Sequence, residues 1–141
     1  MNKILIILTA CFIFLLTDRA MADAGGTIGA RAAIDAEGIV LSAGYRFNSI
    51  LTTEGRWQYQ ETRDAESNYG LYTLWHLPIT QKVHPYAIAA YTKYKDDRGG
   101  HDKSALGFGV KYKILSNIST SLEVVEVDNI DRVTIGCKLE F

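Results

Sequence analysis

The feature that most constrains the fold is an alternation of apolar and polar side chains, in stretches of about ten residues. One stretch sets Leu106, Phe108, Val110 and Tyr112 against Ala105, Gly107, Gly109 and Lys111. A period of two residues is typical of a β-strand whose two faces meet different surroundings. The sequence has only two prolines, Pro78 and Pro85, which suits an extended sheet. The chain is therefore expected to be all-β.

Eight such stretches follow one another, separated by short turn segments such as Asn48-Ser49 and Ser116-Asn117. The predicted strands are Gly25–Ile34, Ile39–Phe47, Ile50–Glu61, Asn68–Leu77, Val83–Lys95, Lys103–Lys113, Ile118–Glu126 and Ile130–Phe141. An even number of strands of this length predicts one closed, eight-stranded antiparallel barrel. The connections on the far side from the N-terminus look short, and the most charged of them is Asp96 to Asp102.

The N-terminal segment has the features of a secretory signal peptide. Lys3 precedes an almost wholly apolar run, Ile4 to Leu16, and Ala20-Met21-Ala22 is a small-x-small cleavage site. Residues 1–22 are therefore expected to be the signal and residues 23–141 the mature domain. An uncleaved anchor and lipidation at Cys11 are alternative readings. After cleavage only Cys137 remains, so no intramolecular disulfide is expected.

A barrel of this size can be a soluble carrier with an apolar interior, or a membrane barrel with the faces inverted. The polar faces of the predicted strands carry many charges, among them Arg31, Arg46, Glu54, Arg56, Lys111, Glu123 and Lys138. Glycines on the same faces leave room for these long side chains. The inverted arrangement would place the charges inside, where they can pair as a structural network. Alternation alone does not decide between the two.

The positions of the aromatic residues favour the membrane barrel. Near the strand ends on the side of the N-terminus lie Tyr45, Phe47, Trp75, Tyr86, Tyr112 and Phe141. Near the opposite ends lie Trp57, Tyr59, Tyr69 and Tyr94. Two aromatic girdles around an apolar band are typical of membrane-spanning barrels. This reading turns one face of the fifth strand outward: Tyr86, Ile88, Ala90 and Tyr94.

The chain ends in the octet Thr134 to Phe141, which has the pattern polar, x, Gly, x, x, apolar, x, terminal Phe. The octet resembles the C-terminal assembly signal of outer-membrane β-barrel proteins, with Thr134, Gly136, Leu139 and Phe141 at its key positions. In architecture the mature chain resembles the small OmpA-like and OmpX/Ail-like barrels. The resemblance implies a bacterial outer-membrane protein, exported by the general secretory route. Its implied partners are membrane lipid, lipopolysaccharide and the barrel-assembly machinery.

Three kinds of function remain open at this point. The preferred prediction is a non-enzymatic protein with a plugged lumen that contributes to envelope integrity or surface interaction. Short outer loops argue against an adhesive role. The second is an enzyme acting on lipid A, for which His101, Asp102 and Ser104 offer suitable side chains. The third is a narrow channel for small solutes.

The remaining predictions concern ligands. Four basic residues of the charged outer segment are candidates for lipopolysaccharide contact: Lys93, Lys95, Arg98 and Lys103. The cysteine pattern suggests no metal site, and no cofactor is expected. A formal net charge of -1 gives no support for nucleic-acid binding.

Overall fold

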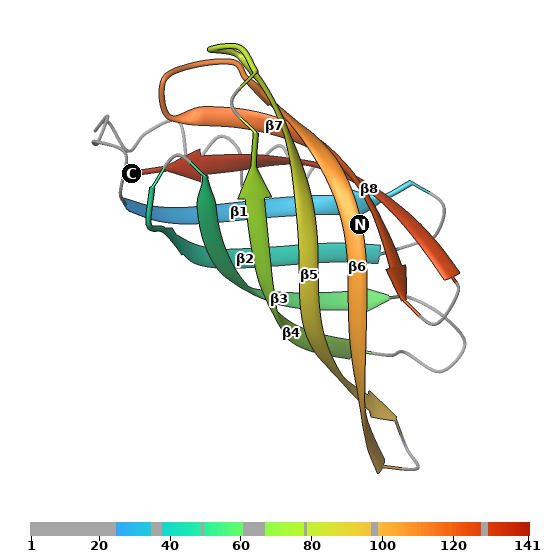
Figure 1. The fold of residues 1–141 in the computed structure, drawn as a ribbon. Coiled ribbons are helices and arrows are strands. Elements are labelled where there is room, and N and C mark those ends of the chain that lie inside the picture. Colours follow the sequence, from blue (N-terminus) through green and yellow to red (C-terminus); the bar gives the residue numbers. More distant parts are fainter. Residues whose placement is uncertain are drawn as a thin grey trace, which may run out of the picture.

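The computed structural model describes residues 25–34, 38–48, 50–60, 67–77, 79–96, 99–127 and 130–141. The predicted signal peptide and its cleavage site lie outside these residues. Eight strands form a closed barrel in which each strand pairs with its neighbour in sequence and β8 returns to β1 (Figure 1). All eight pairings are antiparallel. The predicted eight-stranded antiparallel barrel is confirmed.

The strands have similar lengths except for β5 and β6. Their bounds are β1 (Gly25–Ala33), β2 (Gly38–Arg46), β3 (Leu51–Gln60), β4 (Ser67–His76), β5 (Val83–Asp96), β6 (Gly99–Lys113), β7 (Ile118–Val127) and β8 (Ile130–Glu140).

Local side-chain hydrogen bonds shape the turns at the end of the barrel nearest the N-terminus. The Asn48 side-chain oxygen accepts hydrogen bonds from the backbone N–H groups of Ile50 and Leu51, both at 2.8 Å. The hydroxyl oxygen of Thr80 accepts one from the N–H of Val83 at 2.9 Å. Asn and Thr favour turns because their side chains can replace a backbone partner in this way. At each of these two turns the chain therefore reverses direction within a few residues.

The barrel closes along the seam between β1 and β8. Thr27 lies opposite Glu140 at one end of the seam and Ala33 lies opposite Thr134 at the other. Gly136 sits in the middle of this seam, where a Cβ atom would lie only 2.2 Å from the backbone oxygen of Ala30. The two strands therefore approach closely because this position has no side chain.

The two faces of the barrel wall are inverted relative to a soluble protein. Large apolar residues on the outside are strongly exposed, among them Leu41, Trp57, Leu71, Trp75, Leu106 and Phe108. The inside holds buried charged residues, among them Arg31, Glu54, Arg56, Lys111, Glu123 and Lys138. A surface of this kind requires a nonaqueous surrounding, because such a large exposed apolar area is unfavourable in water.

The faces of β5 differ from the prediction. Tyr86 and Ile88 are buried inside the barrel, and Ala90 and Tyr94 pack against the same internal cluster. Ala87 and Tyr91 face outward instead. The predicted orientation was wrong because both faces of β5 are largely apolar, so alternation did not distinguish them. Tyr86 and Tyr94 therefore do not belong to the aromatic girdles.

The outer connection between β5 and β6 also differs from the prediction. Pairing of these strands continues to Asp96 opposite Gly99, so most of the predicted loop is strand. Among the described residues, β7 ends at Val127, opposite Ala105, and residues 99–104 are paired with β5. The hairpin projects beyond the neighbouring strands at the lower end of Figure 1. The connection itself is short, as predicted, but the paired strands project, so short outer loops no longer argue against an adhesive role.

Candidate functional site

A cluster of buried ionic side chains occupies the middle of the barrel. We call it the central ion network; it consists of Arg31, Glu54, Arg56, Glu123 and Lys138. Four strands supply these residues, because every second position of each strand points inward. Glu54 is 0% exposed and Glu123 1%, so neither carboxylate reaches bulk water. A buried charge needs partners, and the network supplies them.

Arg56 joins the two carboxylates of the network. Its Nη1 lies 2.7 Å from Glu123 Oε2 and its Nη2 lies 3.0 Å from Glu123 Oε1. Its Nε donates to Glu54 Oε2 at 3.0 Å. This two-pronged geometry is the strongest common form of arginine–carboxylate pairing. The guanidinium also lies 4.3 Å from the centre of the Tyr72 ring, a favourable cation–π contact.

Further cations and a hydroxyl complete the coordination of the two carboxylates. Arg31 Nη2 lies 3.0 Å from Glu123 Oε1 and 3.8 Å from Glu54 Oε2. Lys138 donates to Glu54 Oε1. The Tyr86 hydroxyl donates to Glu123 Oε1 at 2.5 Å. Sequence reasoning missed Tyr86 because it placed this residue on the outer face.

A second ionic group lies nearer the end of the barrel that holds the chain's C-terminus. Glu140 accepts from Arg46 Nη1 at 2.6 Å and from Lys111 Nζ at 2.8 Å. Glu140 was not among the predicted site residues. Its position two residues after Lys138 in the same strand places both side chains on one face, so the sequence contained this signal.

Apolar side chains fill the other part of the interior. The internal apolar cluster consists of Tyr72, Leu74, Tyr86, Ile88, Ala105, Val125 and Val127. A cavity beside Arg56, Glu123 and Arg132 has a volume of about 20 Å³. A space of this size holds about one water molecule. Ionic and apolar side chains together therefore occupy most of this part of the lumen.

The predicted lipopolysaccharide contacts are divided between two faces of the projecting hairpin. Lys93 is exposed on the outward face of β5. Lys103 Nζ lies 5.0 Å from the centre of the Tyr94 ring, which faces inward. The side chain of Lys95 and the whole of Arg98 lie outside the described residues. Lipopolysaccharide contact by these four residues stays a prediction.

The candidate catalytic residues lie on the outer part of β6. Asp102 and Ser104 are both exposed on its outward face. The side chain of His101 lies outside the described residues.

The residues of the C-terminal octet are divided between the two faces of β8. Thr134 and Gly136 face inward, and Leu139 and Phe141 occupy the alternate positions. The backbone N–H of Phe141 donates to the oxygen of Gly26 at 2.9 Å, which extends the β1–β8 seam to the last residue. The octet therefore forms the strand that closes the barrel.

In the part of the chain that the structure describes, no helix is long and apolar enough to cross a membrane. The described side chains also contain no group of three or more His, Cys, Asp or Glu residues arranged to hold a metal ion.

Comparisons with solved structures agree on the architecture. A designed transmembrane β-barrel superposes with a TM-score of 0.68 and 14% identity, over 89% of this chain and 100% of the designed one. The N-terminal barrel domain of Pseudomonas aeruginosa OprF superposes with a TM-score of 0.67 and 14% identity, over 84% of this chain and 96% of the OprF domain. The Yersinia pestis outer membrane protein Ail, in a phospholipid bilayer nanodisc, superposes with a TM-score of 0.53 and 16% identity, over 86% of this chain and 100% of Ail. At these identities the likeness concerns the fold alone.

Sequence comparison identifies the family. No curated protein sequence matches the chain. The profile of the family described as "Outer membrane protein beta-barrel domain" matches residues 18–133, which is most of the sequence. The match agrees with the inverted faces and the closed eight-stranded sheet. The chain belongs to this family of outer-membrane β-barrel domains, and its location is the bacterial outer membrane.

Proposed function

We propose that this protein is a non-enzymatic, non-conducting outer-membrane barrel that contributes to envelope integrity. The central ion network is the observation that carries the proposal. Five charged side chains from four strands meet there, and both carboxylates are fully buried. An open ion path would leave these groups hydrated, whereas here their partners are other side chains.

Conductance across a planar lipid bilayer tests the closed lumen. We expect the purified protein to give no single-channel steps above the background of the detergent alone. The variant Arg56→Ala removes a large side chain that bridges both carboxylates and is expected to admit water and raise the conductance. Regular conductance steps from the unmodified protein would contradict the proposal and favour a narrow channel.

The exposed outward position of Lys93 supports a contact between the hairpin and lipopolysaccharide phosphates. Cells that lack the protein are expected to be more permeable to hydrophobic dyes, and the unmodified protein should restore the barrier. Lys93→Glu should restore it less well. Lys82→Glu is the matched control, because Lys82 is exposed in the turn at the opposite end of the barrel. Equal restoration by both variants would remove Lys93 from the proposal.

Mass spectrometry of lipid A tests the non-enzymatic part of the proposal. Lipid A extracted with and without the protein should have the same acyl composition. A loss, gain or transfer of an acyl chain that depends on the protein would show an enzyme. The exposed Asp102 and Ser104 would then be the first residues to replace.

A further inference from the structure

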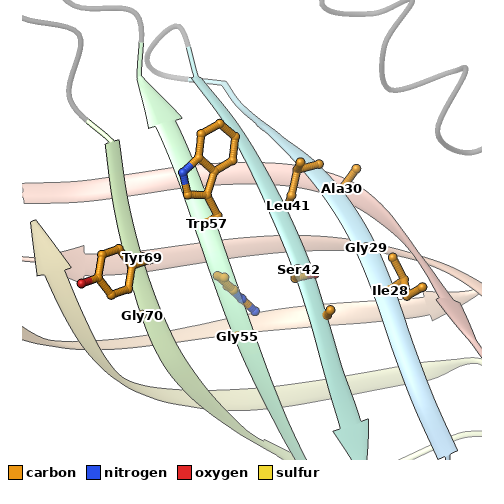
Figure 2. A pocket seen from close by; sticks show the side chains of 11 residues that line it. Ile28, Gly29, Ala30, Leu41, Ser42, Gly55, Trp57, Tyr69 and Gly70 are labelled. Atoms are coloured by element: carbon orange, nitrogen blue, oxygen red, sulfur yellow. The ribbon is translucent and has the colours of Figure 1, made fainter. Parts of the chain in front are cut away.

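The outer wall of the barrel contains a marked hollow, on the strands β1 to β4. Its volume is about 510 Å³, and Figure 2 shows it from close by. The side chains that line it from the outer face are Ile28, Ala30, Leu41, Ala43, Trp57 and Tyr69, with Gly55 among them. These side chains are aliphatic or aromatic, with the Tyr69 hydroxyl and the Trp57 N–H as their polar groups, and Gly55 has no side chain.

The strand register explains why the wall is hollow there. Ala43 lies opposite Gly55, so two small residues form the floor. In the next outward-facing row, Leu41 lies opposite Trp57 and Trp57 lies opposite Tyr69, so bulky side chains form one wall. The Trp57 ring stacks on the Tyr59 ring at 6.1 Å and an interplanar angle of 20°, which supports this wall.

We infer that this hollow binds one acyl chain of an outer-leaflet lipid. The hollow borders the exposed apolar surface by which the barrel meets the membrane, because the exposed Leu71 lies opposite Gly55. It reaches from Gly55, in the middle of β3, toward Trp57 and Tyr69, which lie near the outer ends of their strands. Aromatic residues at such ends mark the outer interface, so the hollow lies at the depth of the outer leaflet.

Packing energy favours a lipid chain at this place. The membrane interior holds no water to fill the hollow, and an empty space there loses the dispersion contacts of its lining. A flexible hydrocarbon chain can follow the irregular floor between Ala43 and Gly55. A second barrel presents a convex wall, whose bulky outward side chains would meet Leu41 and Trp57 first. The geometry therefore selects a chain of lipid over a second copy of the protein.

Gly55→Leu is the variant that fills the hollow. A Cβ atom at this position meets only the backbone oxygen of Ala43, at an ordinary 3.7 Å, so the fold should accept a side chain. Ala87→Leu is the matched control, because Ala87 is exposed on the outward face of β5, away from the hollow. Both proteins should show the same shift in gel mobility on boiling as the parent.

Fluorescence of Trp57 reports whether an acyl chain is bound. The chain has two tryptophans, so Trp75→Phe leaves Trp57 as the only one. In this background, protein purified from outer membranes into mild detergent is titrated with a phosphatidylethanolamine that carries brominated acyl chains, which quench tryptophan on contact. We expect saturable quenching at low lipid content in the parent and in Ala87→Leu. In Gly55→Leu the quenching should rise only in proportion to bulk lipid.

Identical titrations in all three proteins would overturn the inference. Chemical cross-linking of the same samples tests the other occupant. A dimer that forms in the parent and disappears in Gly55→Leu would show that a second copy fills the hollow, which also overturns the inference. Neither result depends on whether the lumen conducts, so this test and the conductance test fail separately.

Discussion

At the scale of single residues, the lumen is organised around two carboxylates with several partners each. The Glu123 carboxylate has three partners within 3.0 Å, which are Arg31, Arg56 and the Tyr86 hydroxyl. The desolvation of such charges is costly, and only their mutual attraction offsets it. Removing one member therefore leaves the remaining charges buried without compensation, so the free energy of unfolding should fall strongly.

Glu123→Gln tests this dependence. The variant keeps the size of the side chain but removes the negative charge that faces Arg31 and Arg56. We expect the free energy of unfolding to fall by about 3–5 kcal/mol. Urea titration of the protein in phospholipid vesicles measures it. Glu126→Gln on the same strand is exposed and should change little; equal losses from both variants would contradict the network.

Tyr86→Phe tests the inward orientation of β5. The change removes one hydroxyl that donates to a buried carboxylate, so the expected loss is about 1.5–3 kcal/mol in the same titration. Tyr112→Phe is the control, since Tyr112 is exposed on the outer face of β6. If Tyr86→Phe were as neutral as the control, Tyr86 would face the lipid as the sequence first suggested.

At the scale of strands, the sheet is closed by the pairing of β8 with β1. Gly136 permits this pairing, because any side chain there meets the Ala30 oxygen and the Arg31 side chain, both closer than 3.0 Å. The same glycine occupies a key position of the octet that resembles an assembly signal. Its structural role in the seam and its proposed role in assembly can be separated by experiment.

Gly136→Ala should reduce the yield of folded protein when the chain refolds from urea into lipid vesicles without any cellular factor. The added methyl group has no space in the seam, and the neighbour that must move is backbone. The gel band of unboiled protein measures the yield. Gly55→Ala is the control, as its Cβ has an ordinary contact. Normal refolding combined with poor assembly in cells would assign Gly136 to recognition alone.

At the scale of the whole molecule, closure leaves each strand with two neighbours. Every backbone polar group within the barrel wall can then pair without water, which the membrane interior requires. In the projecting part of the β5–β6 hairpin, residues 99–104 pair with β5, and the described pairing with β7 begins only at Ala105. That part extends past the other strands (Figure 1), and beyond the membrane water can satisfy backbone groups that have no partner in the sheet.

Closure also predicts resistance to detergent. Opening the sheet at any one place exposes backbone groups of two strands at once, so the barrel should stay folded in sodium dodecyl sulfate until it is heated. Unboiled and boiled samples are therefore expected to migrate differently on a gel. Identical migration would contradict a closed barrel.

The sequence by itself determined the number of strands, their approximate bounds and the inner face of most of them. Wherever one face holds charges and the other bulky apolar groups, as around Lys111 and Phe108, alternation has a single reading. The terminal octet and the strand pattern suggested an outer-membrane barrel, and the family match over residues 18–133 confirms that family without covering the octet.

Only the tertiary structure decided the features that depend on contacts between distant strands. The orientation of β5 is set by Glu123, which lies 37 residues after Tyr86, and no local pattern contains that pair. The hollow at Gly55 arises from the register of neighbouring strands, and the length of the β5–β6 hairpin from pairing across a charged segment. Alternation describes one strand at a time, whereas these features are properties of strands aligned against one another.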